Sequence, residues 1–186
     1  MVVLPWLVWI LASAPWPQLL SREAWSQADA ATRRLDPSEF VELPQVLRTE
    51  LQRRGCTVPQ TYAGGPRHNI ARGELRVSGT FDWAVLCSRE RASSIVVFWG
   101  SDPSDVSEIA RKPDAEFLQG VASGQIGFSR AISIAPPDYI RERHQRYGGP
   151  QLSPLTHAGI NDAFIGKASV VWYQHQGKWL QLTGAD

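Results

Sequence analysis

The chain has 186 residues, of which 43% are hydrophobic and 20% are charged, so it can bury one substantial core and one domain is expected. Its 19 Lys and Arg residues nearly balance its 18 Asp and Glu residues. This near-neutral charge argues against nucleic acid as the main partner.

The N-terminal segment has the pattern of an export signal. Residues 2–20 are apolar and uncharged, and the polar residues 21–30 that follow end in an Ala-x-Ala tripeptide. An earlier Ala-x-Ala precedes Pro15, an awkward residue after a scissile bond. A retained membrane anchor is the alternative, although prolines interrupt a run barely long enough to span a bilayer. We predict a signal peptide over residues 1–30, a secreted or periplasmic location, and no stable membrane span after cleavage.

The sequence contains two cysteines, Cys56 and Cys87. An even number of cysteines in a chain with an export signal predicts one disulfide, which would contribute about 2–4 kcal/mol to stability. A metal or redox pair is the alternative, but the chain has no Cys-x-x-Cys spacing, and the nearest histidine, His68, lies in a loop rich in Pro and Gly.

The first part of the mature chain is expected to contain a leader, a helix and a strand. Residues 31–43 form a polar leader with Phe40 as an apolar anchor, and we expect it to pack loosely. Apolar residues recur at helical spacing over residues 44–55, and Gly55 ends the pattern. A bond between Cys56 and Cys87 would therefore join the end of this helix to the sheet. Residues 69–77 predict one short strand.

Residues 82–99 contain two apolar runs on either side of a charged turn. A loop over residues 89–92 pairs Ser88 with Ser93 and leaves both faces of the hairpin apolar. One face then carries Trp83, Val85, Cys87, Val96 and Phe98, and the other carries Ala84, Leu86, Ile95 and Val97. Strands of this kind are central in a sheet and covered on both sides.

The next segments alternate between loops, a strand and helices. Residues 101–113 are expected to form a loop, and Asp102, Asp105 and Glu108 in it lack the order of a calcium-binding loop. Residues 128–135 predict a strand, and residues 138–149 predict a helix with a solvated arginine face, in preference to a nucleic-acid patch. A short helix is expected over residues 159–167.

The last hairpin carries the most interesting candidate surface. A turn at Gln176-Gly177 pairs His175 with Lys178 and directs one apolar face toward the core. The other face carries two tryptophans and two glutamines, which are the candidate ligand-binding residues: Trp172, Gln174, Trp179 and Gln181. Aromatic rings between amides suit a glycan or an envelope protein as partner. The alternative is that a helix covers this face.

No catalytic or cofactor motif of high specificity is present. His157 and Asp162 are the candidate general-base pair for a small extracytoplasmic hydrolase. The alternative is that His157 is exposed to solvent and that Asp162 or Asn161 caps a helix. We expect no cofactor and no metal.

Several stretches resemble a known group of proteins. The Asp-Trp-Ala-Val-Leu-Cys core at residues 82–87 and the Gly-Lys-Trp-Leu-x-Leu-x-Gly-Ala-Asp ending at residues 177–186 are similar to those of a group of uncharacterised exported bacterial proteins. That resemblance implies export but no activity. Residues 73–75 and 82–85 are also similar to an FG-GAP repeat. Residues 76–81 between them lack the acidic ligands of its calcium loop, and one copy is present.

These observations predict an α+β domain over residues 31–186. It would contain an antiparallel sheet of five or six strands, two or more helices packed on the sheet, and one disulfide. The favoured function is that of an exported, non-enzymatic binding or structural module, and the hydrolase is the alternative.

Overall fold

The computed structural model describes residues 21–150 and 155–183, which form a mixed α+β fold with antiparallel strand pairs. The predicted fold class is confirmed. In chain order the elements are α1 (Arg22–Ala31), β1 (Arg34–Leu35), the 3-10 helix η1 (Pro37–Glu39), α2 (Gln45–Arg53), β2 (Val58–Pro59), β3 (Ile70–Gly73), β4 (Asp82–Arg89), β5 (Ala92–Phe98), β6 (Val106–Pro113), η2 (Asp114–Phe117), β7 (Leu118–Gly120), η3 (Ala122–Gly124), β8 (Ile126–Phe128), β9 (Arg130–Ala135), α3 (Pro137–Tyr147), β10 (Gly159–Phe164), β11 (Ala168–His175) and β12 (Lys178–Thr183).

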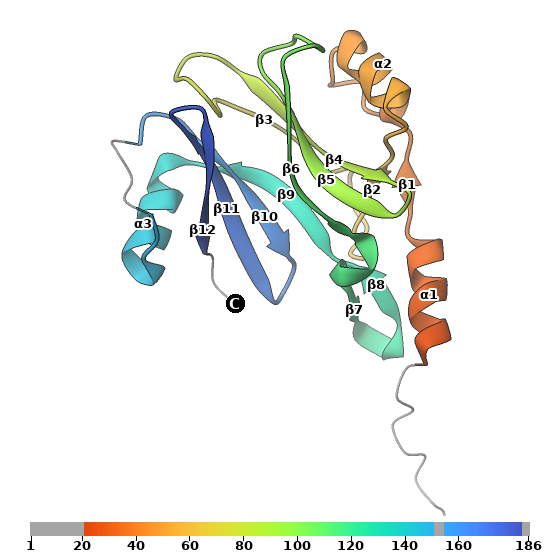
Figure 1. The fold of residues 1–186 in the computed structure, drawn as a ribbon. Helices are drawn as coiled ribbons and strands as arrows, with labels where there is room; N and C mark the ends of the chain where they lie inside the picture. The colour runs from red at the N-terminus through yellow and green to blue at the C-terminus, as the bar shows by residue number, and fades with distance from the viewer. Residues whose placement is uncertain (1–20, 151–154, 184–186) are drawn as a thin grey trace, which may run out of the picture.

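Helix α2, a first sheet, a second sheet and helix α3 stack as successive layers (Figure 1). The first sheet has the strand order β3-β4-β5-β6, and the second has the order β12-β11-β10-β9. The sequence predicted one sheet of five or six strands, whereas the core strands divide between these two four-stranded sheets. Two sheets are formed because the β4–β5 hairpin is apolar on both faces, and the second sheet covers one of them.

The β4–β5 hairpin is the central element of the fold. Its register is the predicted one, with Ser88 opposite Ser93. The face that carries Val85 packs against α2, and the face that carries Ala84 packs against the second sheet. Strand β4 is buried along all but its last residue. The prediction of central strands covered on both sides is confirmed.

Two segments expected to be helix and loop are strands. Strand β10 occupies the predicted short helix and pairs with β9 on one side and β11 on the other. Ladders on both edges and the full burial of Ile160 outweigh the local preference of so short a segment. Strand β6 occupies the predicted loop and pairs with β5. Because β6 lies at the edge of the first sheet, its sequence is mostly polar and lacks the apolar pattern that predicts a strand.

The predicted disulfide between Cys56 and Cys87 is present, with the two Cα atoms 5.1 Å apart. The bond joins Cys56, which follows the C-terminal turn of α2, to Cys87 in β4, as expected. Both cysteines are buried. The leader packs more tightly than predicted, since Leu35, Phe40 and Leu43 are buried in the cluster between α2 and the first sheet.

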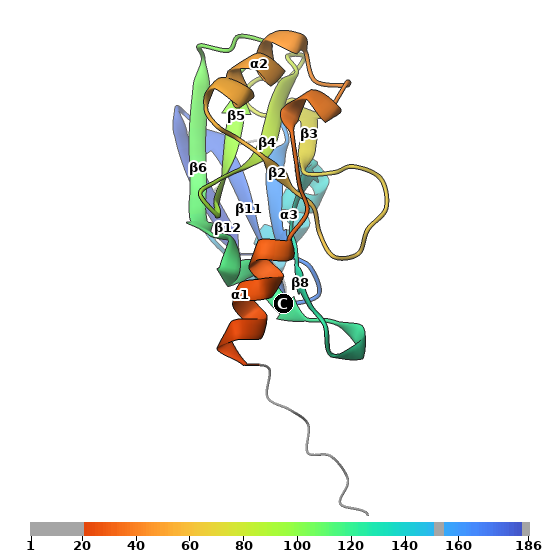
Figure 2. The same cartoon turned by 90° about the vertical axis from the view of Figure 1, so that its right-hand side faces the viewer.

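Helix α1 belongs to the folded domain. It begins after the N-cap Ser21 and packs beside β8 (Figure 2). Trp25 and Ala28 contact the core between the sheets, and Asp29 forms a 2.7 Å ion pair with Arg34. The predicted cleavage point after Ala30 lies inside this helix. The signal peptide itself stays a prediction, because residues 1–20 lie outside the described residues. Within the described part of the chain, no helix is both apolar enough and long enough to cross a membrane.

The two sheets are joined along the edge formed by β3 and β9. Asn69 has a φ of 71°, a left-handed conformation that asparagine tolerates. Its carboxamide accepts from the Ile132 amide at 2.9 Å and donates to the Arg130 carbonyl at 3.1 Å. Asn69 therefore supplies hydrogen bonds that a neighbouring strand would give to β9. Residues of the opposite edges, β6 and β12, border a cavity between the sheets.

Deletion of residues 1–30 should destabilise the protein more than deletion of residues 1–20. The longer deletion removes Trp25 and Ala28 from the core and leaves Arg34 without the Asp29 carboxylate. We expect a loss of about 2 kcal/mol in the free energy of unfolding, because a fully buried large apolar side chain contributes about 1.5–3 kcal/mol, Trp25 is partly buried, and the lost ion pair adds to its contribution. Urea unfolding of the two truncated proteins measures the difference. Equal stabilities would show that α1 is dispensable and would favour cleavage after Ala30.

Glu50 should make the stability of the protein sensitive to acid. Its carboxylate accepts hydrogen bonds from Arg53 and from Arg54, and mainly the Arg53 bond lowers the pKa of Glu50 from 4.5 to about 2. A carboxylate with a lowered folded-state pKa contributes stability that is present above the unfolded pKa and is lost as the pH falls through the folded one. The Glu50→Gln variant should therefore lose less stability than the parent between pH 4.5 and pH 2. Urea unfolding at a series of pH values tests this, and parallel curves for the two proteins would contradict it.

Candidate functional site

Arg130 is fully buried between the two sheets, and each of its five N–H groups has an acceptor. On the second sheet, Nε and Nη2 donate to the two carboxylate oxygens of Asp162, at 2.9 and 2.8 Å. On the first sheet, Nη1 donates to the carbonyl and hydroxyl oxygens of Ser93, at 2.9 and 3.0 Å, and Nη2 donates to the Ala110 carbonyl at 2.8 Å. One side chain therefore joins β9 and β10 to β5 and β6.

A β-bulge in β6 allows Ala110 to reach Arg130. At this point two residues of β6 lie opposite one residue of β5. Ala110 has a φ of 56°, in the left-handed region that costs a non-glycine residue about 1–2 kcal/mol. The strain is retained because the bulge places the Ala110 carbonyl where the guanidinium needs an acceptor.

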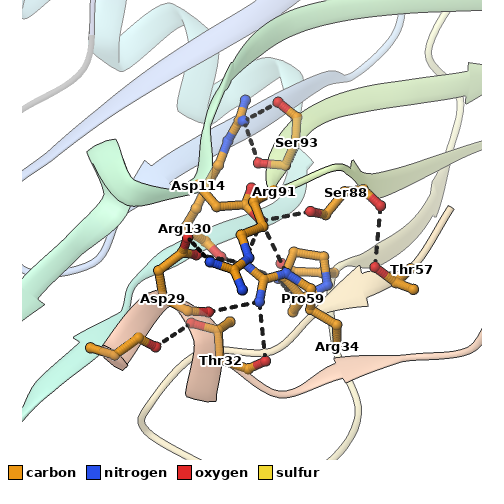
Figure 3. Close-up of polar contacts among 12 residues, drawn as sticks. Asp29, Thr32, Arg34, Thr57, Pro59, Ser88, Arg91, Ser93, Asp114 and Arg130 are labelled. Carbon is orange, nitrogen blue, oxygen red and sulfur yellow. Dashed lines mark hydrogen bonds and ion pairs between the residues drawn. The ribbon is translucent and has the colours of Figure 1, made fainter. Parts of the chain in front are cut away.

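A second polar network, drawn with Arg130 in Figure 3, is centred on the Asp114 carboxylate. Its Oδ2 accepts from Nε and Nη2 of Arg34, at 3.1 and 2.8 Å, and from the Ser88 hydroxyl at 2.6 Å. Nη2 of Arg34 also donates to Asp29 at 2.7 Å. Asp114 is fully buried, and its Oδ1 has no hydrogen-bond partner among the described residues. The network holds α1 and β1 against the ends of β4 and β6.

A cavity of about 200 Å³ lies between the sheets beside the Arg130–Asp162 pair. Segments of both sheets and η2 contribute to its lining. The lining includes three aromatic rings and several polar side chains, among them Phe117, Phe164, Trp172, Lys112, Asp162 and Gln181. An apolar cavity with a few polar groups on rigid strands has the usual composition of a small-molecule site.

Trp172 contributes an unusual polar group to this region. The residue is half-buried and packs against the core between the sheets. Its indole Nε1 is buried and has no acceptor among the residues that the structure describes. An unpaired buried donor costs about 1–3 kcal/mol, and such costs are seldom kept without a reason.

The four predicted ligand-binding residues lie on one face of the β11–β12 hairpin, as the predicted register requires. The first sheet covers that face, whereas α3 covers the opposite one. Trp172 and Gln181 line the cavity. Gln174 is buried, and Trp179 stacks on Trp99 with ring centroids 5.6 Å apart. A role in ligand binding stays a prediction for all four.

The structure does not bring His157 and Asp162 together. His157 is buried and stacks on Tyr173, with ring centroids 4.4 Å apart, in the layer beneath α3. Burial also raises the pKa of Tyr173. Asp162 bonds to Arg130 on the other face of the second sheet. The geometry therefore gives no support to the hydrolase pair.

The buried acidic residues of the described part of the chain, Asp29, Asp82 and Asp114, have structural roles. No group of three or more His, Cys, Asp or Glu residues there could hold a metal ion. Asp82, where the chain enters the first sheet, is fully buried and accepts from the amides of Leu75, Arg76 and Gly100, at 3.0, 3.2 and 2.8 Å. Asp82 therefore anchors two loops.

Comparison of the chain with models of protein families, with curated proteins and with solved structures finds no match in any of the three.

Arg130, the residue that organises the cavity, was not among the residues predicted from the sequence. A signal was available, because Arg130 interrupts an alternation in which Phe128, Ile132 and Ile134 share its face of the predicted strand. A charged residue at an inward-facing position indicates a buried ion pair. The sequence around Ala110 and Lys112 contains no comparable indication that these residues line the cavity.

Removal of one partner of the Arg130–Asp162 pair should be strongly destabilising. Asp162→Asn leaves a buried guanidinium without its counter-charge, so we expect a loss of about 3–5 kcal/mol in the free energy of unfolding. The double variant Arg130→Met, Asp162→Leu should recover part of this loss, but Ser93 and Ala110 would still lack their donor.

Glu142→Gln is the matched control for Asp162→Asn, because it breaks the exposed Arg146–Glu142 pair. It should change the stability by less than about 1 kcal/mol. Urea unfolding measures all three variants. Similar small effects for Asp162→Asn and Glu142→Gln would contradict the role given to Arg130.

Proposed function

We propose that the protein is an exported, non-catalytic binding module whose ligand occupies the cavity between the two sheets. The observation that carries this proposal is the combination of aromatic walls and a few polar groups in that cavity. The disulfide supports an oxidising location, such as the periplasm or the cell exterior, and the apolar N-terminal segment is consistent with export.

The size and composition of the cavity favour a ligand group of about one ring. Its volume of about 200 Å³ is below the range of about 300–1,000 Å³ that holds drug-sized ligands. The rings of Phe117, Phe164 and Trp172 suit the apolar face of a sugar, and Lys112 and Gln181 can bond to its hydroxyl oxygens. We therefore expect the end unit of an envelope glycan as the ligand.

The unpaired indole of Trp172 adds to this expectation. Its N–H group has no acceptor among the described residues. When a rotation of the ring turns this N–H group toward the cavity, a ligand hydroxyl would accept from it and remove the cost of an unsatisfied buried donor. The donor would then select for ligands that carry oxygen over purely apolar ones.

A glycan binding screen with site variants tests the proposal. Monosaccharides, short oligosaccharides and an envelope extract are screened by NMR, and we expect at least one specific ligand. Trp172→Phe retains an aromatic ring but loses the N–H donor, so the affinity should fall about tenfold, which corresponds to 1.4 kcal/mol. Gln181→Ala should have a similar effect. The stability of each variant is measured separately by urea unfolding.

Trp83→Phe is the matched control, because Trp83 packs on the α2 face of the first sheet, away from the cavity. It should bind the ligand like the parent protein. The proposal is wrong if no ligand binds, or if Trp83→Phe weakens binding as much as Trp172→Phe. Conversion of the ligand to a product would show that the protein is an enzyme.

A further inference from the structure

A second hollow, of about 420 Å³, lies on the α3 side of the second sheet. It is bordered by α3 and by the turn that joins β10 to β11. Its charged lining residues are Arg143 and Lys167, and its neutral polar ones include Tyr139, Asn161 and Ser169. No Asp or Glu of the described residues lines it. The hollow is therefore a concave surface with positive charge.

Arg143 differs from the other two arginines of α3. Arg141 pairs with Asp138, and Arg146 pairs with Glu142, in exposed ion pairs along the helix. Arg143 is half-buried, and within the described ranges it forms no ion pair with an acidic residue. A partly buried guanidinium normally acquires a counter-charge, because its desolvation is costly. The solvated arginine face expected from the sequence thus contains one arginine, Arg143, that is partly buried and has no acidic partner among the described residues.

Aromatic and hydroxyl groups hold the Arg143 side chain. Its Nη2 donates to the Tyr139 hydroxyl at 2.6 Å, and this hydroxyl lies 3.4 Å from the Asn161 Oδ1. The guanidinium carbon lies 4.7 Å from the ring centroid of Tyr139 and 5.8 Å from that of Tyr147. These contacts orient the guanidinium but leave its charge uncompensated. Its other N–H groups have no protein acceptor among the described residues.

Lys167 supplies the second cation from a separate segment. It lies in the β10–β11 turn, which is fixed by a 2.9 Å bond from the Ile165 amide to the Ser129 carbonyl. Its Nζ lies 4.5 Å from the ring centroid of Phe164, and no acidic side chain of the described residues lines the hollow around it. A planar guanidinium and an ammonium group on one concave surface are the usual means by which proteins bind oxyanions.

We propose that this hollow is a binding site for an oxyanion group, phosphate or carboxylate, of a small ligand. Arg143 would donate two parallel N–H bonds to two of its oxygens, and Lys167 would act as a point charge. The Asn161 and Ser169 side chains lie at the same surface and can bond to further oxygens. The hollow opens on the α3 side of the second sheet, away from the cavity between the sheets, although Phe164, Ala168 and Ser169 border both. It does not depend on the glycan proposal.

Titration of the protein with inorganic phosphate and with acetate tests this site. NMR chemical shifts are followed at constant ionic strength, with sodium chloride as the reference titration. We expect saturable binding of one or both anions with a Kd of about 1 mM, as for a few charge-assisted hydrogen bonds. Phosphate binding alone would identify a phosphate group as the ligand, acetate binding alone would identify a carboxylate, and equal binding would show a site that accepts either oxyanion.

Three variants decide whether the hollow is responsible. Arg143→Gln and Lys167→Gln should each weaken anion binding at least tenfold. Arg141→Gln is the matched control, because it removes the same charge from the same helix outside the hollow. Lys167 is an exposed turn residue, so its replacement keeps the test valid even if Arg143→Gln unfolds the protein. The proposal is overturned if neither anion binds more strongly than chloride, or if Arg141→Gln weakens binding as much as Lys167→Gln.

Discussion

The buried charge of Arg130 is the constraint on which the arrangement of the two sheets depends. Hydrophobic contact between sheets is non-directional, so apolar side chains alone would allow several relative positions. A guanidinium without water is tolerated only where each N–H group meets an acceptor. Asp162 on the second sheet, together with Ser93 and Ala110 on the first, satisfies that requirement at distances of 2.8–3.0 Å. The relative position of the sheets is therefore fixed by geometry as well as by burial.

The same constraint shapes the cavity. Ala110 and Asp162, two of the residues that bond to Arg130, also line the cavity, so its wall is held by the contacts that fix the sheets. Asn69 joins the sheets at the β3–β9 edge, and Trp99, which follows β5, stacks across the sheets on Trp179 of β12. A cavity held in this way needs little reordering when a ligand enters, which lowers the entropic cost of binding. The left-handed strain at Ala110 is a consequence of the bulge that makes this arrangement possible.

The sequence predicted those parts of the fold that depend on local pattern. The registers of the 82–99 hairpin and of the last hairpin follow from alternation and from turn residues, and both are confirmed. The division into two sheets depends on pairings between distant segments, and the strand β10, predicted as a helix, is specified by its neighbours on both sides. Ala110 prefers a helix, so its left-handed conformation has no local signal. Arg143 and Lys167 are brought to one hollow only by the packing of α3 on the second sheet.

Some buried or half-buried polar groups in the described part of the chain have a partner that neutralises their charge or accepts their hydrogen bond, and others do not. Asp114 and Arg89 each leave one buried atom unpaired, but their charges are compensated by Arg34 and Glu108. The Trp172 indole lacks an acceptor, and the Arg143 guanidinium lacks a counter-charge. Both of these groups belong to the second sheet and the helix that covers it. In the first sheet, the carboxylates of Asp82 and Glu108 have hydrogen-bond donors, and the disulfide ties the end of α2 to β4. Function is therefore best sought on the second sheet, where folding has left polar groups available to a ligand.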